Sequence, residues 1–187
     1  MSASKKNSGT EYEVIGIVNP GLESIGALEV KEILKEKAES KQTVVEFKVK
    51  DLLDAGKFCY SCRVFNRIFV LLSKGKIKTA EDAEKIVGEI DFRNWINKKQ
   101  SFNVECERVG EQDFKSVSVA QHISKVITEK TGCKASFKSA DIGFFAYVYG
   151  KELFFGIDVS GFGVSKRDYK ISPGKESVKG PVGYALV

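Results

Sequence analysis

With 187 residues, 42% of them hydrophobic and 29% charged, the chain has a globular composition and is long enough for two domains of roughly 90 residues each. No apolar run approaches the roughly 20 residues that cross a bilayer, which excludes a transmembrane helix and a membrane partner. The net charge of +5 lies mainly in the second half, where Lys and Arg outnumber Asp and Glu by 14 to 10, against 16 to 15 in residues 1–96.

The N-terminus and the cysteines bear on location. Residues 1–10 are polar and lack the apolar stretch of a signal peptide, so we expect a disordered tail. Four cysteines are too few for a disulfide scaffold, and we expect reduced thiols in the cytoplasm. They are Cys59, Cys62, Cys106 and Cys133.

The first half alternates between strand and helix patterns. Period-two apolar runs predict strands, and apolar residues three to four apart predict helices. The predicted strands are 12–18, 43–49 and 67–72, and the helices are about 22–37 and 51–56. This order is half of a ferredoxin-like arrangement, with helices packed on one face of an antiparallel sheet.

The next segment is predicted to close the first domain. Thr79 is the expected cap of a helix whose first turn is acidic, and Ile90–Ile96 is expected to form a short helical turn. The four polar residues Asn97–Gln100 then predict a domain boundary.

The second half predicts one long helix among strands. The strands are about 101–108, 134–138, 142–149 and 153–159, and a helix capped by Ser116 runs to about Lys130. Val119, Ile123, Val126 and Ile127 form its apolar stripe. The fold class predicted for the whole chain is therefore α+β.

The sequence offers no catalytic constellation. His122 is the only histidine, and we interpret it as a solvated residue opposite the apolar stripe. Cys59 and Cys62 form a C-x-x-C motif, but Cys106 and Cys133 are not spaced as a second pair of zinc ligands, so no metal is expected. Gly161-Phe162-Gly163 lacks the third glycine of a dinucleotide loop, and no cofactor is expected.

Several segments, taken in order, resemble the THUMP-containing RNA methyltransferases. The resemblance covers the chain from about residue 11, and departures from the family pattern include Phe92 in place of Trp. The similar segments are Pro20–Glu23 with Glu29, Cys62–Arg67, Ile90–Phe92, Arg108 with Phe114 and Ser116, Ala140–Ile142, and Ser165–Lys170.

This resemblance implies a ferredoxin-like N-terminal domain at 11–96 and a THUMP α/β domain at 97–165, with residue 75 as an alternative THUMP start. Residues 166–187 would be a basic linker towards a C-terminal domain that is missing here, and the apolar end Val182–Val187 is similar to the helix that leads into it. The family's class I S-adenosylmethionine-dependent methyltransferase domain is not expected within this chain, which is therefore not expected to be an enzyme alone.

The expected partners are structured RNA, typically the acceptor stem and 3′ end of tRNA, and a methyltransferase domain that modifies guanine N2. The phosphates of an A-form stem can be contacted by basic residues without sequence readout. The candidate RNA contacts are Arg108, Lys115, Ser116, Lys134, Lys138, Lys166, Arg167 and Lys170. Arg63 and Arg67 are alternatives for bridging the two domains. The alternative function is an accessory RNA- or protein-binding protein that recruits an unrelated RNA-modifying enzyme.

Overall fold

The computed structural model describes residues 11–136, 139–161, 164 and 180–186. The chain divides into two compact units: unit 1 comprises residues 1–70 and 162–187, and unit 2 comprises residues 71–161. The expected boundary at Asn97–Gln100 differs from this division, because that segment is a turn inside unit 2, closed by a 2.9 Å hydrogen bond from Gln100 N to Asn97 O. Among the described residues, every helix is too short or too polar to cross a lipid bilayer.

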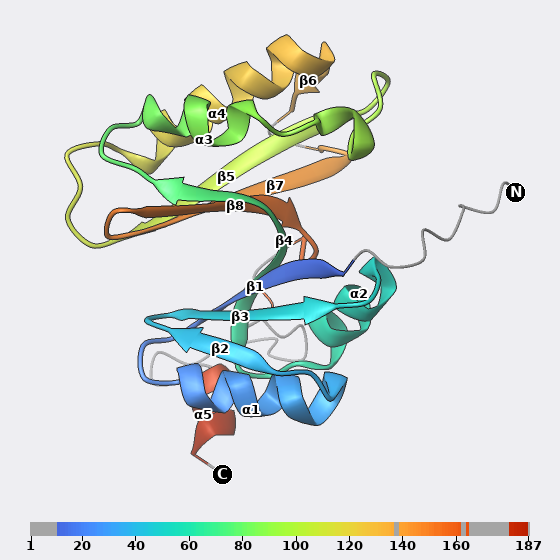
Figure 1. Ribbon diagram of the computed structural model, residues 1–187, viewed down its shortest axis with the longest axis vertical. Helices are drawn as coiled ribbons and strands as arrows, with labels where there is room; N and C mark the ends of the chain where they lie inside the picture. The colour runs from blue at the N-terminus through green and yellow to red at the C-terminus, as the bar shows by residue number, and fades with distance from the viewer. Residues whose placement is uncertain (1–10, 137–138, 162–163, 165–179, 187) are drawn as a thin grey trace, which may run out of the picture. The chain divides into compact units, whose positions relative to one another are not determined.

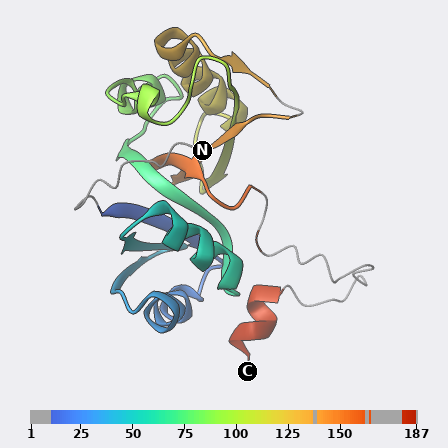
Figure 2. The same cartoon turned by 90° about the vertical axis from the view of Figure 1, so that its right-hand side faces the viewer.

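Unit 1 has a ferredoxin-like fold, as predicted, and its element order is β-α-β-β-α-β, with one strand more than the sequence predicted. Its strands lie in the order β2-β3-β1-β4, all neighbours being antiparallel. Helices α1 and α2 contact each other and β3 (Figure 2). The elements are β1 (Tyr12–Val18), α1 (Glu23–Leu34), β2 (Ala38–Lys41), β3 (Val44–Val49), α2 (Leu52–Ser61) and the first part of β4 (Phe65–Lys76).

Glu29 ties α1 to the segment between α2 and β4. Its side chain lies in the interior, with only 3% of its surface exposed. Its two carboxylate oxygens accept hydrogen bonds from Arg63 N at 2.8 Å and from Val64 N at 3.0 Å. A buried carboxylate is tolerated where such donors replace water. One of the residues that carries the family resemblance therefore has a structural role.

Unit 2 is built on five strands in the order β4-β8-β7-β5-β6. β5 is parallel to β6 and β7, and β7 is antiparallel to β8. Helices α3 and α4 lie on the same side of β5, β7 and β8 (Figure 1). The elements are the second part of β4, α3 (Asp82–Gly88), the 3-10 helix η1 (Phe92–Asn94), β5 (Ser101–Val109), α4 (Ser116–Thr131), β6 (Lys134–Ala135), β7 (Ile142–Tyr149) and β8 (Glu152–Asp158).

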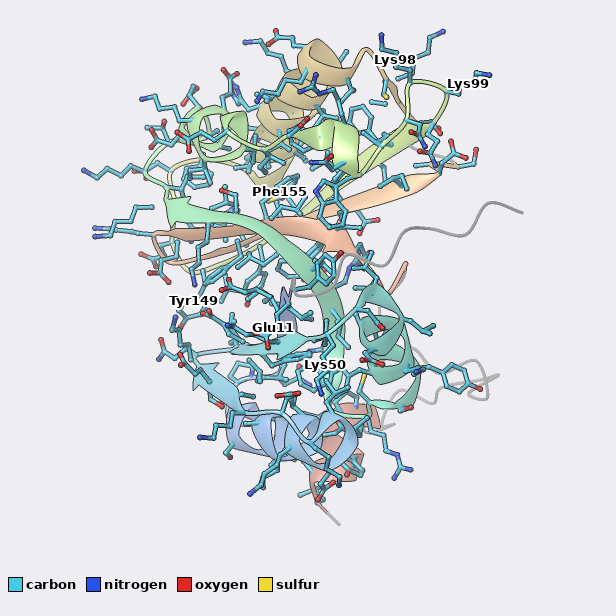
Figure 3. All side chains as sticks on the ribbon, turned by 45° about the vertical axis from the view of Figure 1, so that its right-hand side comes forward. Glu11, Lys50, Lys98, Lys99, Tyr149 and Phe155 are labelled. Carbon is cyan, nitrogen blue, oxygen red and sulfur yellow. The ribbon has the colours of Figure 1, made fainter. Side chains whose placement is uncertain are left out.

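The core of unit 2 lies between these helices and the sheet. The predicted apolar stripe of α4 is buried, and Gly132 ends the helix at a φ of 72°. Phe144 stacks on Phe155 with ring centroids 5.7 Å apart, and Phe92 meets Phe144 edge-on at 5.7 Å. Figure 3 shows Phe155 between the strands and the helices. Aromatic pairs in these geometries stabilise a core beyond the area that they bury.

Asp141 fixes the start of β5 beside the start of β7. Its Oδ2 accepts hydrogen bonds from Ser101 N and Ser101 Oγ, both at 2.7 Å, and Asp141 N donates to Ser101 O at 3.1 Å. The hydrogen bond from the Ser101 backbone, followed by that from its hydroxyl, lowers the pKa of Asp141. Asp141 is thus a second residue of the family resemblance that, like Glu29, has a structural role.

Candidate nucleic-acid interface

Four of the eight predicted RNA contacts lie among the described residues, and they fall into two groups. Arg108, Lys115 and Ser116 lie at the end of β5 and the start of α4, whereas Lys134 lies beyond the other end of α4. The sixteen residues of α4 separate the groups by about 24 Å, at about 1.5 Å per residue. Lys138, Lys166, Arg167 and Lys170 lie outside the described residues.

Arg108 is held at the surface by the loop that connects β5 to α4. Its Nη1 donates to Gln112 Oε1 at 3.0 Å, and Gln112 Nε2 donates to Val109 O at 2.9 Å and to Gly150 O at 3.0 Å. Gly110 turns the chain there with a φ of 101°. The loop therefore positions an exposed guanidinium seven residues before the second predicted cation, Lys115.

The start of α4 has no side-chain cap. Lys115, rather than the predicted Ser116, is the residue that precedes the helix, with extended backbone angles of −91° and 148°. It makes no capping hydrogen bond, and the first turn contains no acidic residue. The first backbone N–H groups of a helix have no partner within it and carry partial positive charge. An anion is therefore favoured at this end of α4.

An open pocket of about 470 Å³ adjoins the starts of both α3 and α4. Lys78 and Lys115 bring two cations to it, and Glu81 and Asp113 bring two carboxylates. Ala80, Thr79, Phe114 and Ser118 complete the lining. Lys78 and Thr79 are held in place because their backbone N–H groups each donate to Asp82 Oδ2 at 3.0 Å. The pocket combines donors for a phosphate with acceptors for hydroxyl groups.

The second group contains more lysines than predicted. Lys134 pairs in register with Ser101, next to the turn that carries Lys98 and Lys99. All three lysines are exposed. Lys98 and Lys99 were not among the predicted contacts, because their turn was expected to be a domain boundary. Lys78, which precedes α3, was not predicted either. Two sequence signals could have indicated these contacts. One is a pair of adjacent lysines between two predicted elements, and the other is a lysine just before the acidic start of a helix.

His122 is not a fully solvated residue, so that interpretation was wrong. Its side chain is 26% exposed, and its Nδ1 lies 2.7 Å from Glu84 Oε1 on α3. Lys125 Nζ donates to the same oxygen at 3.2 Å. The hydrogen bond with His122, then that with Lys125, lowers the pKa of Glu84. This polar cluster joins α3 to α4. It adjoins the pocket through Glu81, which lines the pocket and lies 3.7 Å from His122 Nε2.

The described cysteines are free thiols, of which Cys62 and Cys133 are buried. Burial raises the pKa of Cys106 to about 12. Within the part of the chain that the structure describes, no group of three or more His, Cys, Asp or Glu residues is arranged to hold a metal ion.

Comparison with known proteins identifies one domain and a set of longer relatives. Residues 77–158 match the family model of the THUMP domain. A tRNA (guanine(6)-N2)-methyltransferase of Methanocaldococcus jannaschii is 28% identical over 166 residues, covering 82% of this chain and 43% of that protein. A probable tRNA sulfurtransferase of Methanobrevibacter smithii is 32% identical over 78 residues, covering 40% of this chain and 20% of that protein. The chain thus spans less than half the length of each relative.

Among solved structures, a predicted N6-adenine-specific DNA methylase from Listeria monocytogenes superimposes with a TM-score of 0.76. The match covers 95% of this chain and 48% of that chain at 19% sequence identity. At this identity the likeness shows a shared fold, which extends over both units.

Proposed function

We propose that the chain, whose residues 77–158 match the THUMP domain, docks structured RNA for an RNA-modifying enzyme. The observation that carries the proposal is the combination of this domain with relatives that are named as a tRNA methyltransferase and a tRNA sulfurtransferase. The two relatives are named for different chemistry on the same substrate, tRNA, which fits a chain that binds this substrate rather than one that reacts with it.

The RNA that we propose is tRNA, bound through its acceptor stem and 3′ end. The pocket at the starts of α3 and α4 suits a terminal nucleotide. Lys78, Lys115 and the N-terminal N–H groups of α4 would contact a phosphate. Glu81 and Asp113 would accept hydrogen bonds from ribose hydroxyls, which only a free 3′ end presents as a pair. Arg108 would contact the backbone of the adjoining stem.

The enzyme that we propose is a class I S-adenosylmethionine-dependent guanine-N2 methyltransferase domain outside residues 1–187. The support is the longer of the two alignments, which extends over unit 1 as well as the THUMP domain. The sulfurtransferase relative supports the alternative that the module serves another tRNA-modifying enzyme, but its alignment covers only 40% of the chain.

Fluorescence anisotropy with a 5′-labelled acceptor-stem hairpin tests the RNA-docking role. We expect binding that weakens steeply between about 50 and 200 mM salt, because phosphate neutralisation supplies most of the free energy. Removing the single-stranded 3′ end should reduce affinity. Lys78→Ala/Lys115→Ala should weaken binding roughly tenfold and reduce the salt slope by about two. Lys31→Ala/Lys37→Ala, which removes two exposed lysines of unit 1, is the matched control. Absent or salt-independent binding would rule out the docking role.

A further inference from the structure

The turn at residues 97–100 belongs to unit 2, is closed by hydrogen bonds and carries two lysines. Asn97 N donates to Gln100 Oε1, and Gln100 N donates to Asn97 O, both at 2.9 Å. These two bonds close the turn and leave Lys98 and Lys99 at its tip. Figure 3 shows both side chains at the outer surface of unit 2.

A third lysine is held beside this turn by the end of α4. The buried Cys133 donates its thiol hydrogen to Asn97 O at 3.3 Å, and the next residue, Lys134, pairs with Ser101 in the parallel register of β5 and β6. Segments 36 residues apart in sequence are thereby joined at one edge. Lys98, Lys99 and Lys134 together are called the lysine edge below.

The lysine edge has no intramolecular charge partner among the described residues. No ion pair involves its three lysines within 11–136 and 139–161, although other basic residues at this end are paired. Arg93 bonds Asp91, and Lys130 donates to the carbonyls of Gly88 and Ile90 at the end of α3. The carboxylate of Asp141 accepts two hydrogen bonds from Ser101. Three cations held together without an acidic partner raise the local potential and favour a polyanion.

We propose that the lysine edge is a second contact for the RNA backbone, at the opposite end of α4 from the pocket, about 24 Å away along the helix, and used together with it by one RNA stem. This inference rests on the proposed RNA-docking function and names a surface that the function alone does not require. Lysine presents a point charge rather than a planar fork, so the contact is with phosphates and carries no base readout. A-form RNA advances by about 3 Å per base pair, so bridging the two sites takes a stem of about eight base pairs.

The length of the RNA stem therefore separates the two sites. The test uses two hairpins that share a single unpaired 3′ nucleotide, too short to span the two sites, one with a stem of about four base pairs and one of about twelve. With the 3′ end in the pocket, only the longer stem reaches the lysine edge. Anisotropy titrations with chain 1–187 compare the wild type, Lys98→Ala/Lys99→Ala/Lys134→Ala and the control Lys31→Ala/Lys37→Ala/Lys50→Ala, which removes the same charge from unit 1.

The expected result is a loss confined to the long stem. The lysine-edge variant should bind it about tenfold more weakly or worse, with a salt slope smaller by about three, and bind the short stem like the wild type. The control should bind both like the wild type. Equal losses of affinity for both stems would overturn the inference. No loss for either stem would also overturn it, and an acidic protein surface would then be the candidate partner of the lysine edge. If the wild type binds neither hairpin, the RNA-docking function itself fails.

Discussion

Two residues that carry the family resemblance, Glu29 and Asp141, have a structural role in the chain. Each is a carboxylate that accepts hydrogen bonds from the backbone of a distant segment, 34 residues away for Glu29 and 40 residues away for Asp141. A sequence pattern shows that such positions matter, but it does not show whether they serve a ligand or the fold. The distances favour the fold here, because both oxygens of Glu29 and the Oδ2 of Asp141 accept hydrogen bonds from within the chain.

Glu29→Gln should destabilise the protein by about 2 kcal/mol. The amide oxygen can still accept one of the hydrogen bonds from Arg63 N and Val64 N, but the amide nitrogen is a donor and would leave the other N–H unsatisfied. Urea denaturation followed by circular dichroism measures the change. Glu32→Gln on the exposed side of α1 is the control and should alter the free energy of unfolding by less than about 0.5 kcal/mol. A similar small value for Glu29→Gln would show that this anchor is dispensable.

At the scale of elements, the start of α4 is the feature that links stability to binding. A capping side chain would stabilise the helix, yet Lys115 occupies the capping position and supplies none. The pocket lies at the same place. A poor cap at a binding site is expected where a ligand supplies the missing acceptor.

Lys115→Ser and Lys115→Ala should therefore separate the two effects. Both variants lose the cation, so both should weaken binding of the acceptor-stem hairpin by a similar factor. Only serine can accept a hydrogen bond from the first turn, so Lys115→Ser should be more stable than Lys115→Ala by about 1 kcal/mol. Thermal unfolding and anisotropy on the same samples provide the measurements. Equal stabilities would mean that α4 does not begin at Ser116, and wild-type affinity in both variants would remove Lys115 from the interface.

The elements show where sequence reasoning succeeds. Strands β1 and β7 were predicted at their exact bounds, because alternating β-branched and aromatic residues leave little ambiguity. β2 was missed, since three of its four residues are exposed and polar, and only pairing with β3 makes it a strand. The lysine edge was missed for a related reason. Its members come from two segments, and no local pattern indicates that a thiol contact with Asn97 brings them together.

At the scale of the whole molecule, the chain is similar over 82% of its length to a protein named as a tRNA methyltransferase, and the fold that it shares with a solved structure extends over both units. The sequence contains no glycine-rich dinucleotide fingerprint. Our proposal assigns the cofactor and the chemistry to a domain outside residues 1–187. The predicted loop cations Lys166, Arg167 and Lys170 remain predictions, since they lie outside the described residues.

Chain 1–187 should not bind S-adenosylmethionine. Isothermal titration calorimetry with the cofactor should give no heat beyond dilution. The Methanocaldococcus jannaschii relative, named as a methyltransferase and more than twice as long as the aligned segment, is the positive control under the same conditions. Stoichiometric binding in the micromolar range would contradict the division of roles that we propose.

The placement of unit 2 inside the sequence of unit 1 has a consequence for biosynthesis. Ribosomes deliver a chain from its N-terminus, and domains generally fold as units during synthesis. Unit 2 is one continuous segment, 71–161, whereas unit 1 also needs residues that follow it. Val164 N donates to Asn66 O at 2.9 Å, and Arg63 lies over the ring of Tyr184 in α5 (Gly180–Ala185), 5.4 Å from its centroid. The THUMP-containing unit is therefore the first that a nascent chain can finish, although the other unit emerges first.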